Sequence, residues 1–201
     1  MIRRRFRLLL PMLFLISAQV GWAQAGSSSK QKRIVFDISS HLGTGSLKTS
    51  ADVAAPTLGS FGLGVSLGFN IKRFSLGVAS DYRILTQYSS VEDSVGNRRG
   101  NFLSPISLFV RLNFEKIKFG IILINSGQYD LMNKTADGKK VSYTKPSGFR
   151  FHFGFKNFKK FTPELFYESV DFSEKNVDGV VSTLSDKMNY GSYGLGVRYE
   201  F

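Results

Sequence analysis

Large apolar residues alternate with small or polar residues along most of this chain, with a period of two. The clearest run is 61–71, where every odd-numbered residue is large and apolar and every even-numbered residue is glycine, serine or asparagine. A second run is 149–155, where four phenylalanines alternate with Arg150, His152 and Gly154. A period of two belongs to the β-strand, whose successive side chains point to opposite faces. The pattern therefore predicts strands with one apolar and one polar face.

Eight segments carry this alternation, and their connections are short and long in turn. The predicted strands are 34–42, 61–71, 74–84, 102–114, 117–123, 149–155, 161–167 and 193–201. Short turns are expected at 72–73, 115–116 and 157–160, and long loops at 43–60, 86–101, 125–147 and 169–189. Pro105 and Pro163 lack an N–H, so each is expected near a strand end or a bulge. This spacing predicts an all-β fold, an eight-stranded antiparallel up-and-down barrel.

The size of the apolar face decides which side of such a barrel points outward. A soluble barrel of the lipocalin type turns its apolar residues inward, but an eight-stranded barrel has an interior only just wide enough for side chains to fill. About three dozen large side chains cannot fit there. The opposite face is rich in glycine and small polar residues, which suits a narrow lumen. We therefore predict a transmembrane barrel, apolar outside and polar inside, in preference to a soluble β-sandwich.

The N-terminal residues have the three parts of a secretory signal. Four arginines lie within the first seven residues, an apolar run covers 8–16, and the sequence Ala23-Gln24-Ala25 follows. We predict a signal peptide over 1–25, cleaved after Ala25 or Ala23, then a short periplasmic segment over 26–33 and the barrel over 34–201. No later segment has the roughly 20 apolar residues of a spanning helix. The expected location is the cell outer membrane.

Basic residues are in excess, and they gather where the short turns are. The chain has 27 lysines and arginines and 15 acidic residues; without the four arginines of the predicted signal, 23 basic residues and a net charge of +8 remain. The excess comes from Lys30, Lys32, Arg33 and from a basic collar of four residues at the predicted turns: Lys72, Arg73, Lys159 and Lys160. We expect this collar to meet anionic phospholipid headgroups or acidic wall polymers. Nucleic acid is not an expected partner of an exported chain.

Charged residues of both signs fall on the inward face of the predicted strands. They are, with one histidine, Asp37, Asp81, Arg83, Arg111, Lys118, Arg150, His152, Lys156, Glu164, Glu168, Arg198 and Glu200. Isolated charges in a narrow lumen are costly, so we predict a network of ion pairs that closes the barrel. A tight turn near Phe158 would bring Glu164 opposite His152 or Gly154, and Glu168 opposite Gly148 or Arg150. A gated path for ions or small solutes is the alternative.

The last strand carries the most specific motif. Its outward residues are Tyr193, Leu195, Val197, Tyr199 and the terminal Phe201. This pattern resembles the barrel-assembly signal of the small eight-stranded outer-membrane β-barrel proteins of Gram-negative bacteria, the type of OmpX and of the OmpA membrane domain. The resemblance covers about residues 34–201. It implies outer-membrane lipid, lipopolysaccharide and the outer-membrane assembly machinery as partners.

Three functions remain open to such a barrel. The first is a non-enzymatic surface protein whose four long loops carry structural or interaction roles, including contact with a surface ligand. The second is a narrow channel. The third is a lipid A-modifying enzyme that uses a histidine with a serine and an acid. Phe153 and Gly154 follow His152, so the His-x-Ser pairing expected of the deacylase type is absent. His41, expected at the outer end of the first strand beside Ser39 and Ser40, is the remaining candidate. With two histidines and no cysteine we assign no catalytic, metal or cofactor site.

Overall fold

The computed structural model describes residues 34–48, 58–87, 98–135, 137–156 and 160–201, which belong to one compact unit. These residues form nine antiparallel strands, and no helix occurs among them. No helix of the described part is long and apolar enough to cross a membrane. The predicted signal peptide, the segment 26–33 and Lys159 lie outside the described residues.

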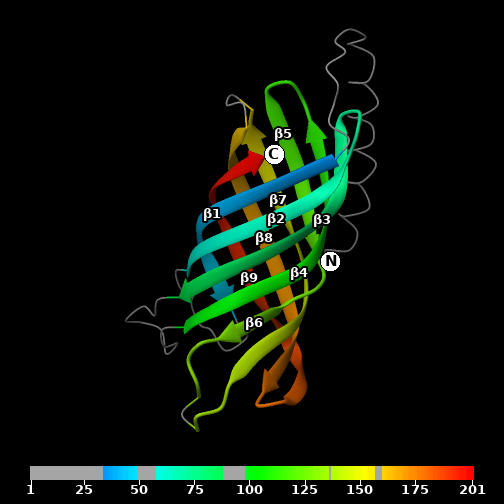
Figure 1. The fold of residues 1–201 in the computed structure, drawn as a ribbon. Helices are drawn as coiled ribbons and strands as arrows, with labels where there is room; N and C mark the ends of the chain where they lie inside the picture. Colours follow the sequence, from blue (N-terminus) through cyan, green and yellow to red (C-terminus); the bar gives the residue numbers. More distant parts are fainter. Residues whose placement is uncertain (1–33, 49–57, 88–97, 136, 157–159) are drawn as a thin grey trace. The chain divides into compact units, whose positions relative to one another are not determined.

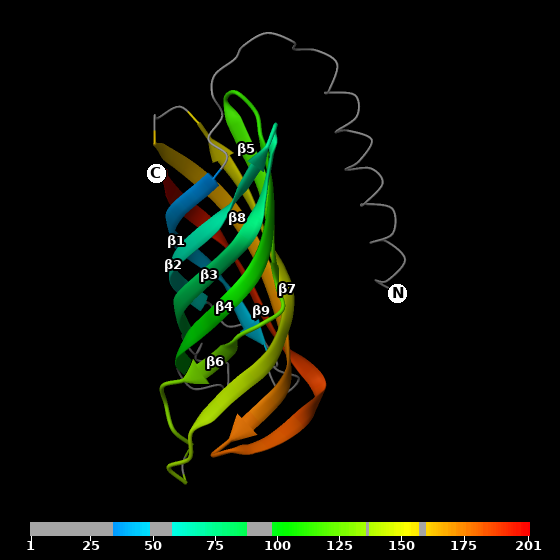
Figure 2. The same cartoon turned by 45° about the vertical axis from the view of Figure 1, so that its right-hand side comes forward.

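The nine strands make a closed ring with eight positions (Figures 1 and 2). In chain order they are β1 (Ile34–Lys48), β2 (Leu58–Ile71), β3 (Phe74–Gln87), β4 (Arg98–Asn113), β5 (Ile117–Ile124), β6 (Gln128–Leu131), β7 (Val141–Phe155), β8 (Phe161–Val177) and β9 (Val180–Glu200). Both β5 and β6 pair with β4 on one side and β7 on the other, so together they fill a single position. The pairing of β1 with β9 closes the ring. The predicted eight-stranded up-and-down barrel is confirmed.

The outer face of the ring carries a belt of exposed apolar side chains. On β2, Leu63, Leu67 and Phe69 expose 48, 53 and 60% of their surface, while the inward Ser66 between them exposes 3%. All the remaining strands except the short β6 contribute similar residues, such as Leu76, Leu108 and Leu195. A soluble monomer rarely exposes so large a continuous apolar surface. The belt therefore faces hydrocarbon, and the predicted orientation, apolar outside and polar inside, is confirmed.

The strands are longer than predicted, and the four long loops are correspondingly shorter. β8 and β9 continue to a two-residue turn at Asp178–Gly179, so most of the predicted loop 169–189 is strand. β6 and the early part of β7 fill much of 125–147, and β1 to β4 each extend into the predicted loops 43–60 and 86–101. The alternation continues in these extensions with its chemistry inverted, apolar inward and polar outward. A prediction that recognises strands by their outward apolar residues therefore places the strand ends too early.

Pro105 lies in a β-bulge and Pro163 near a strand end, as predicted. Ala79 pairs with Ser107 and Asp81 with Ser104, so Pro105 and Ile106 together oppose the single residue Ser80. The Ser126 hydroxyl donates to the Ile106 carbonyl oxygen at 2.5 Å and accepts from its N–H at 3.3 Å. These bonds satisfy backbone groups that the bulge removes from the ladder. Pro163 is the third residue of β8.

The two rims of the barrel differ. We call the rim with the Lys72–Arg73 and Glu115–Lys116 turns the turn end, and the opposite rim, with the β8–β9 turn, the hairpin end; the orange hairpin marks it at the bottom of Figure 1. The Glu200 N–H donates to the Lys160 carbonyl at 2.9 Å at the turn end. The Phe201 ring lies 4.9 Å from the ring of Phe36. The C-terminus is thereby attached to both of its neighbouring strands.

Substitution of Gly194 should weaken the closure between β9 and β1. A Cβ at this position would lie 2.0 Å from the Leu42 carbonyl oxygen, which is backbone and cannot swing away. We expect Gly194→Ala to lower the free energy of unfolding by about 1–3 kcal/mol, measured by urea unfolding of the protein refolded into phospholipid vesicles. Gly59→Ala is the control, because its Cβ would meet its nearest atom at 3.8 Å. Equal stability of the two variants would contradict this account.

Candidate functional site in the barrel lumen

Four charged side chains from three strands form a closed cluster in the middle of the lumen. Arg150 of β7 donates from Nε to Glu168 of β8 at 2.7 Å and from Nη1 to Asp81 of β3 at 3.0 Å. Arg83 of β3 forms ion pairs with Glu168 and, at 3.7 Å, with Asp81. Glu168 lies directly opposite Arg150 in the β7–β8 ladder, one of the two predicted registers. Each charge in this cluster faces two opposite charges.

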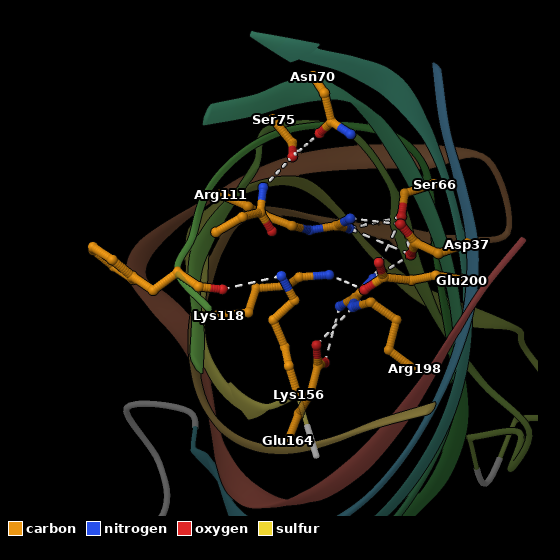
Figure 3. Close-up of polar contacts among 12 residues, drawn as sticks. Asp37, Ser66, Asn70, Ser75, Arg111, Lys118, Lys156, Glu164, Arg198 and Glu200 are labelled. Atoms are coloured by element: carbon orange, nitrogen blue, oxygen red, sulfur yellow. Dashed lines mark hydrogen bonds and ion pairs between the residues drawn. The ribbon is translucent and has the colours of Figure 1, made fainter. Parts of the chain in front are cut away.

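A second cluster, nearer the turn end, crosses the lumen from β1 to β4 (Figure 3). Arg198 holds both oxygens of Glu164, with Nε–Oε1 at 2.6 Å and Nη2–Oε2 at 3.0 Å, and it also pairs with Asp37. Arg111 reaches Asp37 from the other side at 2.5 Å and donates to the Ser66 hydroxyl at 2.7 Å. Asp37 therefore accepts from two guanidinium groups.

The turn end of the lumen holds one further ion pair, between Lys118 of β5 and Glu200 of β9. With this pair, the lumen ion-pair network has five bases and five acids: Arg83, Arg111, Lys118, Arg150, Arg198, and Asp37, Asp81, Glu164, Glu168, Glu200. All but Glu200 are buried. The network is neutral, and removal of any one partner would leave a buried charge uncompensated.

Two residues predicted for this network lie outside it. Lys156 follows the last residue of β7, so its half-buried side chain reaches the rim, where it donates to the Phe114 carbonyl at 3.1 Å. Burial lowers its pKa from the usual value. His152 is buried, but neither ring nitrogen has a hydrogen-bond partner among the described residues. Its Nε2 lies 2.2 Å from where a Cβ of Gly120 would be, so the ring fills the space which that glycine leaves.

His41 lies well inside the lumen, because β1 continues for seven residues beyond it. The outer position expected from the shorter predicted strand is therefore wrong. The ring is 4% exposed and packs edge-on against Phe166, with the ring centroids 5.4 Å apart. The structure thus separates His41 from the lipid-facing surface of the barrel.

Toward the hairpin end the lumen is apolar. Each of the eight ring positions contributes one inward side chain to an apolar layer, and none of these is more than 7% exposed: Leu47, Leu58, Leu85, Phe102, Tyr129, Tyr143, Phe172 and Tyr190. The Phe102 ring meets Phe172 edge-on at 5.3 Å between centroids. The Arg83 guanidinium lies 5.4 Å from the same Phe102 ring. This contact joins the apolar layer to the ion-pair network on its turn-end side.

The sequence prediction missed the apolar layer because its members fall in the predicted loops or at their edges. It also missed Ser66, which stands directly opposite Asp37 in the β1–β2 ladder. The spacing from the inward charged residues could have identified the layer. Leu85 follows Arg83 by two residues, and Phe172 follows Glu168 by four. An even spacing along a strand keeps side chains on one face.

The other predicted residues lie on the outside of the barrel. In the basic collar, Lys72 and Lys160 are exposed and Arg73 is partly buried; the Lys160 ammonium lies 5.6 Å from the ring of Tyr199. Binding of the collar to anionic headgroups stays a prediction. Tyr193, Leu195, Val197, Tyr199 and Phe201 follow the outer face from the middle of β9 to the turn end. Their role as an assembly signal also stays a prediction.

The closed, apolar-belted ring is similar to solved structures. The structure of Neisserial surface protein A matches with a TM-score of 0.50 and 14% identity, over 84% of this chain and 97% of that chain. The fold is that of the outer-membrane β-barrels. Weaker similarities include Ail, the attachment invasion locus protein of Yersinia pestis (TM-score 0.45, 14% identity, 84% of this chain and 98% of that chain). Another is the outer-membrane protease OmpT from Escherichia coli (TM-score 0.43, 12% identity, 89% and 100%). No protein-family model and no curated protein matches the sequence.

Removal of one buried base should destabilise this outer-membrane β-barrel far more than removal of an exposed one. Arg198→Met leaves Asp37 and Glu164 buried without their shared partner, so we expect a loss of about 3–5 kcal/mol. Lys145 pairs with Glu174 at 2.7 Å but is 71% exposed, and Lys145→Met should cost about 0–1 kcal/mol. Urea unfolding in vesicles measures both. Similar losses in the two variants would show that the lumen network adds no more stability than a surface pair.

Proposed function

We propose that this protein is a non-conducting outer-membrane barrel that anchors a contact surface on the outside of the cell. In this orientation the turn end faces the periplasm and the hairpin end faces outward, as expected for barrels with short periplasmic turns. The observation that carries the proposal is the apolar layer, to which every position of the ring contributes a buried side chain.

Two successive barriers support a closed lumen. An ion that crossed this layer would exchange its water shell for aliphatic and aromatic side chains with only a few phenol and amide groups among them, and a largely apolar constriction opposes ion passage for this reason. Beyond that layer, the Asp81, Arg83, Arg150 and Glu168 cluster spans β3, β7 and β8. A solute would have to separate these buried pairs. The geometry therefore favours an anchor over the narrow channel.

The strand extensions at the hairpin end support a role in contact. Their inward residues make a core, and their outward residues are mostly polar, as expected of a part that stands in water. At the tip of the β8–β9 hairpin, Val180 and Val181 are 72 and 55% exposed. Exposed β-branched residues beside a turn offer apolar contact area to a partner. The enclosed position of His41 supports a non-enzymatic role, since acyl chains of the bilayer meet only the outer face.

Planar-bilayer recording tests the closed lumen. We expect the folded protein to give no stepwise conductance, because both barriers would have to open together. A variant that truncates three rings of the apolar layer, Phe102→Ala/Phe172→Ala/Tyr190→Ala, should also give no conductance while the ion-pair network remains. Reproducible steps from the unmodified protein, lost in Arg150→Gln or Glu168→Gln, would instead support the channel.

Shortening of the β8–β9 hairpin tests the contact surface. Glu174 pairs with Thr183 beyond a bulge, so an Asn-Gly turn can replace residues 175–182 without touching the membrane belt. We expect the barrel to fold and attachment of expressing cells to one another or to cultured epithelial cells to fall about tenfold or more. Lys72→Gln, at the opposite rim, is the control. Unchanged attachment with a folded barrel would contradict the proposal.

A further inference from the structure

A groove opens on the outer surface of the barrel at its hairpin end. Its volume is about 580 Å³, and it is lined by residues of β4, β6, β7 and β8 and of the turns that follow β6 and β8. Small-molecule sites commonly have volumes of roughly 300–1,000 Å³. The groove lies well away from the lumen network and from the turn end.

The floor of the groove is a row of four polar side chains on adjacent strands. Asn101 of β4 pairs with Asp130 of β6, Asp130 with Ser142 of β7, and Ser142 with Asn176 of β8. Cross-strand partners point to the same face at separations of about 5 Å. The row therefore presents two carboxamides, one carboxylate and one hydroxyl in a line.

Hydrogen bonds within the chain hold two members of this row, Asp130 and Asn176, and the nearby Asp178 of the lining. The Gln128 amide donates to Asp130 at 2.5 Å, and the Lys140 N–H donates to Asp178 at 2.9 Å. The Gly179 N–H donates to the Asn176 side-chain oxygen at 2.8 Å, which turns the Asn176 NH₂ group away from its own turn. Two members of the row, Asp130 and Asn176, are thus held in place before any ligand binds, and this lowers the entropic cost of binding.

The walls of the groove add positive charge and small apolar surfaces. Lys134 and Lys140 line it, and within the described residues neither ammonium pairs with a carboxylate. Both carboxylates of the lining, Asp130 and Asp178, already accept hydrogen bonds from the chain. Met132 and Val141 complete the walls. The two ammonium groups balance the two carboxylates in the charge of the lining, and an anionic group of a ligand would find its counter-charges at Lys134 and Lys140.

We propose that this groove binds an acidic saccharide, with its hydroxyls on the polar row and its carboxylate or phosphate at Lys134 and Lys140. Carboxamides, carboxylates and hydroxyls supply both donors and acceptors, which sugar hydroxyls require. The described lining includes no aromatic ring on which a nucleobase would stack. No group of three acidic or histidine residues that could hold a metal ion occurs in the described chain. The inference deepens the proposed function, because it requires the hairpin end to face outward.

Titration of the full mature protein in phospholipid nanodiscs tests the groove. The probes are sialyllactose, the lipid-free core oligosaccharide of lipopolysaccharide, and lactose as the neutral counterpart. We expect at least one acidic probe to bind about tenfold more tightly than lactose. Lys134→Gln/Lys140→Gln should remove that preference, and Asn101→Ala/Asn176→Ala should weaken acidic and neutral probes alike. Lys72→Gln/Lys160→Gln, with the same loss of charge at the turn end, should bind as the unmodified protein does.

The outcomes distinguish between two sources of the ligand, and between the saccharide site and the contact surface. Preference for the core oligosaccharide indicates a glycolipid of the same membrane, and preference for sialyllactose indicates a glycan of another cell; both support the inference. No saturable binding at millimolar concentration, or equal binding by the Asn101→Ala/Asn176→Ala variant, would overturn it. Loss of attachment in the shortened hairpin variant would then still support the contact surface without a saccharide site.

Discussion

A strand in hydrocarbon has no water to satisfy its N–H and carbonyl groups, so each edge of every strand in a bilayer must pair with a neighbouring strand. In this chain the pairing of β1 with β9 meets that demand and closes the ring. Closure at eight positions fixes a narrow interior, and the narrow interior determines which residues can point inward. Gly120 shows how little room remains, because a methyl group there would meet the inward side chains of His152 and Arg111.

The narrow lumen also explains its charges. Arginine is long enough to reach across the barrel, and its forked guanidinium can hold two carboxylates at once. Arg198 does so with Asp37 and Glu164, and Arg150 with Asp81 and Glu168. Strands that are far apart in the sequence are thereby tied through the interior as well as through their ladders. The apolar layer takes over this task where the barrel leaves the bilayer.

Much of this fold could be read from the sequence, since outward apolar residues at every second position identify the strands that cross the bilayer. An ion pair between neighbouring strands, such as Arg150 with Glu168, can be predicted because the tight turn between the two strands sets their register. An ion pair across the lumen cannot be predicted in this way. Whether Arg111 reaches Asp37 depends on the stagger of β1 against β4, which the sequence pattern does not give. The row from Asn101 to Asn176 was hidden for a related reason, because its four members come from three separate predicted loops and meet only through pairing.

The inversion of the pattern along each strand has a mechanical consequence. On the turn-end side of the inversion, lipid surrounds the barrel and ion pairs fill it; on the hairpin-end side, the same strands enclose an apolar core and turn mostly polar residues outward. The hairpin end therefore does not depend on hydrocarbon to cover its outer face, because its apolar side chains point inward. The outward residues of this end also escape the requirement for hydrophobic side chains that the bilayer imposes on the rest of each strand.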